Sequence, residues 1–204
     1  MQDMRSFPTL LSTVQPLPEG INPGLQAIGD SEILNLEYTA LFCSVRCPGD
    51  LILKTYDLAR AMREAETPVI GGFQTPMEKE CLRLLLRGNQ PVVICPARSI
   101  DNMRVPRAWR PAIAEQRLLV LSSFPPSQRR PTVKLAAQRN DMVVTLASRV
   151  FIAYAALGGK TEELARKGAG SGKPLLTLDS PANANLIELG ARVVEVDGRT
   201  DLSI

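Results

Sequence analysis

The chain has 204 residues, of which 45% are hydrophobic and 22% charged, and its formal net charge is +3. This length suffices for one well-buried domain, and the composition is that of an ordinary soluble globule. No run approaches the roughly 20 apolar residues of a membrane span, and no signal-peptide core opens the chain, so we expect a cytoplasmic protein without membrane contact. The sequence contains no histidine, which excludes Ser-His, Cys-His and HExxH catalysis.

The pattern of elements changes near residue 37. Proline and glycine are frequent before it, so we expect an irregular N-terminal arm over residues 1–36, with a short helix near Glu32–Leu36, and one domain over residues 37–204. Within that domain, apolar runs of strand length are Thr39–Cys43, Pro68–Ile70, Pro91–Cys95, Leu118–Leu121, Val150–Tyr154, Leu175–Leu178 and Val193–Val196. Helical stretches are expected at Leu51–Glu66, Met77–Arg87, Thr132–Ser148, Thr161–Lys167 and Asn183–Leu189.

Strands that are apolar throughout and alternate with amphipathic helices predict an α/β fold. The expected architecture is a doubly wound, mostly parallel sheet with helices on both faces. Ligands of such sheets bind beyond the carboxyl ends of the strands, where loops lead into helix N-termini. The residues that directly follow each strand are therefore the candidates for a functional site.

Three of these loops combine glycines, hydroxyls and cations. Paired glycines let backbone N–H groups approach an anion, and hydroxyls and cations complete such a site. The candidates are Ser44 and Arg46 after the first strand, Gly71, Gly72 and Thr75 after the second, and Gly158, Gly159, Lys160 and Thr161 after the fifth. These loops predict a cleft that binds phosphate. A P-loop is excluded, because that motif requires glycine where Tyr154 stands.

Cations are concentrated between residues 98 and 139, where acids are few. A solvated basic surface and a polyanion site both fit this distribution. Within the expected helix Thr132–Ser148, Arg139 offers a planar fork for phosphate and Asn140 can bind a base edge or an adjacent loop. The four cysteines form no CxxC pair, so we expect reduced thiols, no metal and no cofactor.

The strand-end motifs, taken in order, resemble the DprA/Smf family of DNA-processing proteins. Leu41–Arg46 is similar to that family's V-G-S-R strand end, and Val69–Phe73 is similar to its S-G-x-A turn. Ser122–Pro126 is similar to the family's S-E-x-P-P motif, and Ala137–Asn140 is similar to its F-P-x-R-N-R helix. Tyr154–Thr161 stands in the place of the E-A-x-x-S-G-S segment, and Leu186–Ala191 matches L-I-x-x-G-A. The resemblance covers residues 25–197. The chain departs from the family at Cys43, where the family has glycine.

This resemblance implies an extended Rossmann-like fold that binds single-stranded DNA without catalysing a reaction. It also implies a homodimer that passes the strand to a RecA-type recombinase during natural transformation. The family's phosphate site would be lined by Ser44, Arg46, Gly71, Gly72, Arg139, Asn140 and Gly159. For a protein that binds single-stranded DNA, we further expect Phe73 or Phe124 to stack a base.

The chain also resembles the Lonely Guy nucleotide phosphoribohydrolases. Arg139 and the segment Gly158–Leu164 are similar to the arginine helix and the P-G-G-x-G-T-x-x-E loop of those enzymes. That resemblance implies a site for a nucleoside monophosphate, with Glu162 or Glu163 as the acid that cleaves its glycosidic bond. Both glutamates also fit the first turn of a helix, where carboxylates offset the helix dipole. The sequence leaves both possibilities open.

Overall fold

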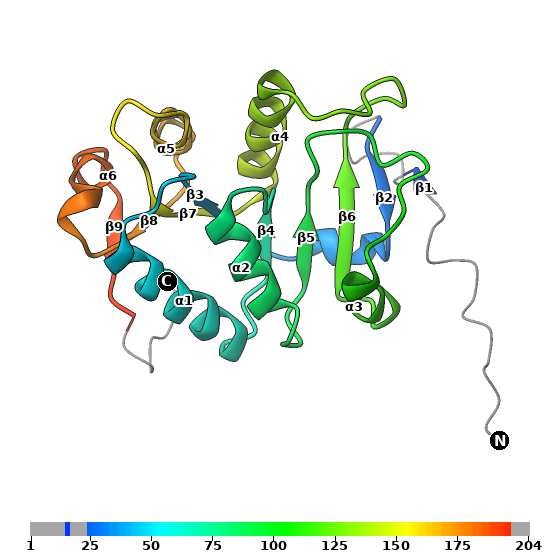
Figure 1. Ribbon diagram of the computed structural model, residues 1–204, viewed down its shortest axis with the longest axis horizontal. Helices are drawn as coiled ribbons and strands as arrows, with labels where there is room; N and C mark the ends of the chain where they lie inside the picture. The colour runs from blue at the N-terminus through cyan, green and yellow to red at the C-terminus, as the bar shows by residue number, and fades with distance from the viewer. Residues whose placement is uncertain (1–14, 17–23, 197–204) are drawn as a thin grey trace.

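The computed structural model describes residues 15–16 and 24–196. Its strands form one sheet in the order β1-β2-β6-β5-β4-β3-β7-β8-β9, in which β1 and β2 are antiparallel to their neighbours and the other pairs are parallel (Figure 1). The bounds are β1 Gln15–Pro16, β2 Gln26–Ile28, β3 Thr39–Cys43, β4 Val69–Gly71, β5 Val92–Ile94, β6 Leu118–Ser122, β7 Arg149–Tyr154, β8 Leu175–Leu178 and β9 Arg192–Val194.

The chain reverses its direction of travel across the sheet at β3. From β3 it adds β4, β5 and β6 on one side, and then it returns to place β7 on the other side of β3. The central pair is in register from Thr39–Arg149 to Phe42–Ile152, with an irregularity after Phe42. The β3–β7 junction is therefore the switch point at which doubly wound sheets bind ligands.

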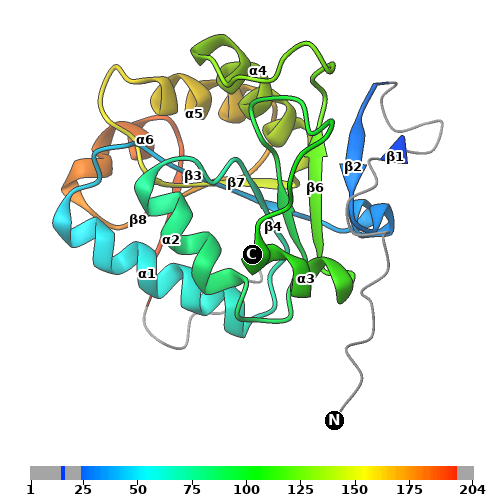
Figure 2. The same cartoon turned by 45° about the vertical axis from the view of Figure 1, so that its right-hand side comes forward.

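Helices cover both faces of the sheet, as Figures 1 and 2 show from two directions. One hydrophobic cluster packs α1, α2 and α3 against one face, and a second cluster packs α4, α5 and α6 against the other. The bounds are α1 Gly49–Glu64, α2 Pro76–Leu85, α3 Arg110–Ala114, α4 Val133–Leu146, α5 Lys160–Gly170 and α6 Ala184–Glu188, with short 3-10 helices η2 Ser31–Asn35, η3 Arg107–Trp109 and η4 Pro181–Asn183.

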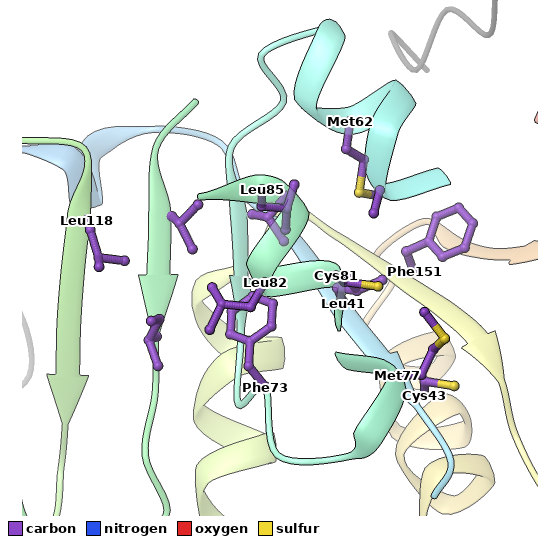
Figure 3. Close-up of a cluster of buried hydrophobic side chains, with 14 of the residues drawn as sticks. Leu41, Cys43, Met62, Phe73, Met77, Cys81, Leu82, Leu85, Leu118 and Phe151 are labelled. Atoms are coloured by element: carbon purple, nitrogen blue, oxygen red, sulfur yellow. The ribbon is translucent and has the colours of Figure 1, made fainter. Parts of the chain in front are cut away.

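The first cluster reaches the carboxyl edge of the sheet. Figure 3 shows Cys43 and Met77 there, where β3 ends and α2 begins, and it shows Phe73 below Leu82. Each of these side chains is buried. The loops at this edge are thus anchored by apolar packing, which fixes the positions of the polar groups that follow the strands.

The predicted α/β class and the alternation of strands and helices are confirmed, and the strands lie within two residues of their expected bounds. The prediction of an irregular arm over residues 1–36 is not confirmed for residues 26–28. These residues form β2, which pairs with β6 through Gln26–Ser122 and Ile28–Val120. A strand this short between Gly24 and Gly29 has no recognisable period, because its structure comes from pairing with β6. The rest of the arm, residues 1–14 and 17–23, lies outside the described residues.

Helix α3 was also absent from the sequence-based expectation. It has five residues and contains Pro111 in its first turn, which is too short for the apolar spacing of a helix to be recognised. No helix of the described residues is long and apolar enough to cross a membrane.

One lysine closes the carboxyl end of α4. The Lys173 ammonium donates to the carbonyl oxygens of Val144 and Thr145 at 2.7 Å and of Ala147 at 2.6 Å. The last carbonyls of a helix have no partner within the helix, and a cation there also offsets the helix dipole. Lys173 therefore fixes the end of the helix that carries Arg139.

We predict that Lys173→Met lowers the free energy of unfolding by about 1–3 kcal/mol, because three carbonyls lose a charged donor. Chemical denaturation followed by circular dichroism measures this change. Lys167→Met is the matched control, since among the described residues the Lys167 ammonium bonds only the exposed Asp141 carboxylate, at 2.9 Å, and its loss should cost less than about 1 kcal/mol. Equal effects of the two substitutions would contradict the capping role of Lys173.

Candidate functional site

The three loops singled out in the sequence follow neighbouring strands. β4, β3 and β7 are adjacent and parallel, so the segments after Gly71, Cys43 and Tyr154 emerge side by side at the carboxyl edge of the sheet. Neighbouring strands lie roughly 4.8 Å apart. Residues more than a hundred positions apart in the chain are thereby brought together across the switch point.

Ser44 joins two of these loops. Its N–H donates to the Tyr154 carbonyl at 2.9 Å, and its hydroxyl oxygen accepts from the Ala156 N–H at 3.1 Å. The side chain is buried. The serine expected to face a ligand therefore holds the β3 loop against the β7 loop.

The β7 loop turns sharply into α5. Gly158 has a φ of 69°, a left-handed conformation that favours glycine, and the Gly159 N–H donates to the Ala156 carbonyl at 2.9 Å. Gly159 caps α5 without a side-chain hydrogen bond. Lys160 is exposed at the first position of this helix and Thr161 is half-buried. The turn thus presents a cation beside a helix N-terminus, an arrangement that favours anions.

Glu162 stabilises the same turn from inside the helix. Its carboxylate accepts from the Gly158 N–H and, at 3.0 Å, from the Arg166 guanidinium. The Gly158 hydrogen bond is the main cause that lowers the pKa of Glu162, followed by bonds and charge from Asn185 and Arg166. Glu162 is buried and Glu163 is exposed. Both oxygens of Glu162 are therefore engaged in the helix start.

The buried carboxylate of Glu78 connects the loops after β3 and β4. One oxygen accepts from the Cys43 N–H at 3.0 Å, and the other accepts from the Gln74 N–H at 2.9 Å and the Thr75 N–H at 3.2 Å. The Thr75 hydroxyl in turn accepts from the Glu78 N–H at 3.3 Å. Thr75 and Glu78 thus form a capping box, and the bond to Cys43 extends it to a second strand.

Arg139 lies beneath the β4 loop. Its guanidinium donates to the Cys95 carbonyl at 2.9 Å and to the Asn140 side-chain oxygen at 2.7 Å, and the residue is 4% exposed. Burial lowers the pKa of Arg139, whereas the charge of Glu78 raises it. Burial likewise raises the pKa of Glu78, and the three N–H donors and Arg139 oppose that shift. The buried charges of Arg139 and Glu78 thus compensate each other beneath the loop after β4.

Gly72 makes room for this arginine. A Cβ atom at position 72 would overlap the Arg139 guanidinium, so glycine is required by close approach at this position. Gly71 is buried one residue earlier, at the end of β4.

The structure divides the predicted residues into two groups. Arg46 and Lys160 are exposed, whereas Ser44, Gly71, Gly72, Thr75, Arg139 and Asn140 have roles within or beneath the loops. The expectation that Phe73 or Phe124 stacks a base is wrong, because the two rings are 5% and 4% exposed and pack in hydrophobic clusters. Their sequence position after a strand gave no sign that the rings turn inward.

The fold also divides the basic stretch. Arg98, Arg129, Arg130 and Lys134 follow β5 or β6 at the carboxyl edge, whereas Arg107, Arg110 and Arg117 lie in or near η3, α3 and the start of β6. Only the first group lies at the same edge as Arg46 and Lys160. Among the described residues no cluster of cysteine, aspartate or glutamate could hold a metal ion.

Two free thiols, Cys43 and Cys47, lie close together at the end of β3 and just after it. A hydrogen bond between Cys43 and Cys47 raises the pKa of Cys43 and lowers that of Cys47. Cys43, Cys81 and Cys95 are buried, and Cys47 is half-buried. Cys47 is therefore the cysteine on which a thiol reagent should act first, because the thiolate is the reactive form.

We predict that Gly72→Ala displaces the Arg139 side chain and lowers the free energy of unfolding by about 1–3 kcal/mol, as overpacking does. Thermal unfolding measures the loss. Gly170→Ala is the control, because a Cβ at position 170, also within the described part of the fold, meets no atom within 4 Å. If Gly72→Ala is as stable as Gly170→Ala, then Arg139 does not occupy this space.

Glu162 gives a pH-dependent prediction. Its folded pKa lies below the unfolded value of about 4.3, so the ionised carboxylate stabilises the fold above that value and this contribution is lost as the pH falls through the folded pKa. Glu162→Gln should therefore destabilise the protein at pH 7, and this deficit should shrink as the pH falls below about 4.3 and through the folded pKa. Urea unfolding across an acidic pH series tests this, and Glu163→Gln should show neither effect. A Glu162→Gln deficit that stays constant over the whole series would contradict the assignment.

Comparisons with known proteins agree with this fold. The family model for DNA recombination-mediator protein A matches residues 1–199. A sequence search of curated proteins returns no match.

Among solved structures, the chain is similar to DNA processing protein A from Helicobacter pylori, a structure that describes the single-stranded DNA binding mode of that protein. The TM-score is 0.69 and the sequence identity 20%, and the match covers 93% of this chain and 88% of that one. It is also similar to DNA processing protein A from Streptococcus pneumoniae (TM-score 0.69, 16% identity, coverage 86% and 64%). A molybdenum cofactor binding protein from Rippkaea orientalis shares the fold less closely (TM-score 0.54, 12% identity, coverage 78% and 88%). Because the family model spans nearly the whole sequence, the chain belongs to the DNA recombination-mediator protein A family.

Proposed function

We propose that this protein binds single-stranded DNA by its phosphate backbone along the carboxyl edge of β4, β3 and β7, and that it acts in DNA uptake and recombination. The observation that carries the proposal is the convergence of three glycine-containing loops at the switch point, with Arg46 and Lys160 exposed beside them. Free cations at such an edge suit phosphates, which are the sequence-independent part of nucleic-acid recognition.

The charge distribution supports this reading. Within residues 24–196 no hydrogen bond or ion pair engages the side chains of Arg46, Lys160, Arg98, Arg130 or Lys134. By contrast, the buried Arg139 and Glu78 offset each other below the loops. The free positive charge therefore lies at the surface of the carboxyl edge, where a polyanion can reach it.

Family membership supports the wider role. By analogy with the family, the protein would act in the cytoplasm as a homodimer that delivers the bound strand to a RecA-type recombinase during natural transformation. Ser44, Gly71, Gly72, Thr75, Asn140, Gly158, Gly159 and Thr161 would shape the phosphate site, and Arg46 and Lys160 would supply its charge, with the buried Arg139 supporting the β4 loop from beneath.

A phosphoribohydrolase of Lonely Guy type, or a sensor of small nucleotides, is the alternative. The position of Glu162 argues against the enzyme, because its carboxylate is engaged by Gly158 and Arg166. A general acid needs a carboxyl group free to approach the sugar. Incubation with nucleoside monophosphates should release no free base, and release that disappears in Glu162→Gln or in Glu163→Gln would favour the enzyme.

We predict that a labelled oligothymidylate binds with an affinity that falls steeply with salt. Arg46→Ala and Lys160→Ala should each reduce the slope of log K against log salt by about 0.7, the value for one phosphate contact on a single strand. Fluorescence anisotropy across a salt series measures the slope. Arg87→Ala is the matched control, because Arg87 is exposed just beyond the end of α2, away from the strand-end loops. Binding that is absent or insensitive to salt would refute the proposal.

A further inference from the structure

A groove opens directly beside the proposed phosphate site. It lies between the amino-terminal half of α1 and α2, has a volume of about 510 Å³, and is lined by residues that include Val45, Arg46, Cys47, Ile52 and Tyr56. This volume falls within the roughly 300–1,000 Å³ typical of small-molecule sites.

The wall of this groove is apolar and partly aromatic. Val45 is 68% exposed and Ile52 is 36% exposed, although both are aliphatic. Tyr56 is half-buried on α1 with its side chain at the groove. Among the described residues the aromatic side chains that are not buried are Tyr56, Tyr154 and Trp109. All three pack partly against the core, and of the three only Tyr56 lines the groove, so Tyr56 is the aromatic side chain that a base in the groove would meet.

The rim of the groove is positive. Arg46 and Lys79 line it, and neither side chain has a hydrogen bond or ion pair within the described residues. The remaining charges largely compensate each other, since the Arg83 guanidinium pairs with the Glu80 carboxylate. An apolar and aromatic wall with free cations at its rim matches a ligand that has a flat apolar part and an adjoining anion.

Arg46 belongs both to the groove and to the loop after β3, so a strand whose phosphate contacts Arg46 already lies at the mouth of the groove. We propose that the groove is a nucleotide subsite that receives one base of the bound single-stranded DNA against Tyr56, with Arg46 and Lys79 on the flanking phosphates. This assignment rests on the proposed function and specifies where an unpaired base is bound. Base–aromatic contact of this kind tolerates every base, because each has a π-face.

Cys47 provides a direct measure of occupancy, since it lines the groove while the other three cysteines are buried. We expect a saturating oligothymidylate to slow alkylation of Cys47 by iodoacetamide several-fold, with the modified residue identified by peptide mass mapping. Thymidine monophosphate at the same nucleotide concentration should leave the rate unchanged. If the oligonucleotide binds by anisotropy and Cys47 reacts at its original rate, the subsite is refuted and the proposed function stands. If no oligonucleotide binds, the proposed function itself fails.

A variant pair tests the base contact itself. Tyr56→Leu keeps an apolar side chain but removes the ring, and it should weaken oligothymidylate binding about ten-fold while the salt slope stays unchanged, because stacking contributes without releasing counterions. Trp109→Leu is the control, since Trp109 is also half-buried but lies in η3 outside the groove. Equal affinities of the two variants, or protection of Cys47 by the monophosphate as strong as that by the oligonucleotide, would overturn the assignment.

A second pair tests the phosphate contact. Lys79→Ala should lower the salt slope by about 0.7 and should reduce the protection of Cys47, whereas Arg87→Ala, beyond the opposite end of the same helix, should change neither. Circular dichroism of each variant confirms that the fold is retained. If Lys79→Ala leaves both the salt slope of binding and the protection of Cys47 as they are in the parent, then the strand does not pass over this rim.

Discussion

The carboxyl edge of this protein depends on one buried carboxylate. Glu78 accepts hydrogen bonds from N–H groups at the end of β3 and at the start of α2, and the charge of Arg139 acts on it from the opposite face of the sheet. A buried charge is tolerated only when donors and an opposite charge compensate its loss of water. The same compensation fixes the loops after β3 and β4, so their free backbone and side-chain groups are held in place before any ligand arrives.

This arrangement separates the charges that build the site from those that can bind. Arg139 and Glu78 are buried and act on each other, whereas Arg46, Lys79 and Lys160 are at the surface without a partner in the described part of the chain. A single strand that lies over these cations would meet loops whose backbone is already held by internal hydrogen bonds. The ordering cost of binding would then fall mainly on the exposed side chains of Arg46, Lys79 and Lys160.

Local sequence patterns predicted much of the fold but only part of the site. The capping box at Thr75 and Glu78 was readable, because a hydroxyl three residues before a glutamate satisfies donors within one turn. The bond from Cys43 to the same carboxylate spans 35 positions and leaves no local signal. Phe73 and Phe124 follow strands and were expected to face a ligand, yet they are buried, because packing and not chain position decides where a ring in a loop turns.

The sequence by itself determined the α/β class, the succession of strands and helices along the chain and the loops that carry glycines and cations, because apolar periodicity and turn chemistry act over a few residues. Tertiary structure decided which of these loops are neighbours, that β2 joins the sheet, and that Arg139 supports the β4 loop from below while Arg46 is exposed. Strand order and burial arise from contacts between distant segments. No pattern in a short window of sequence records such contacts, so the groove beside Arg46 became visible only in the folded chain.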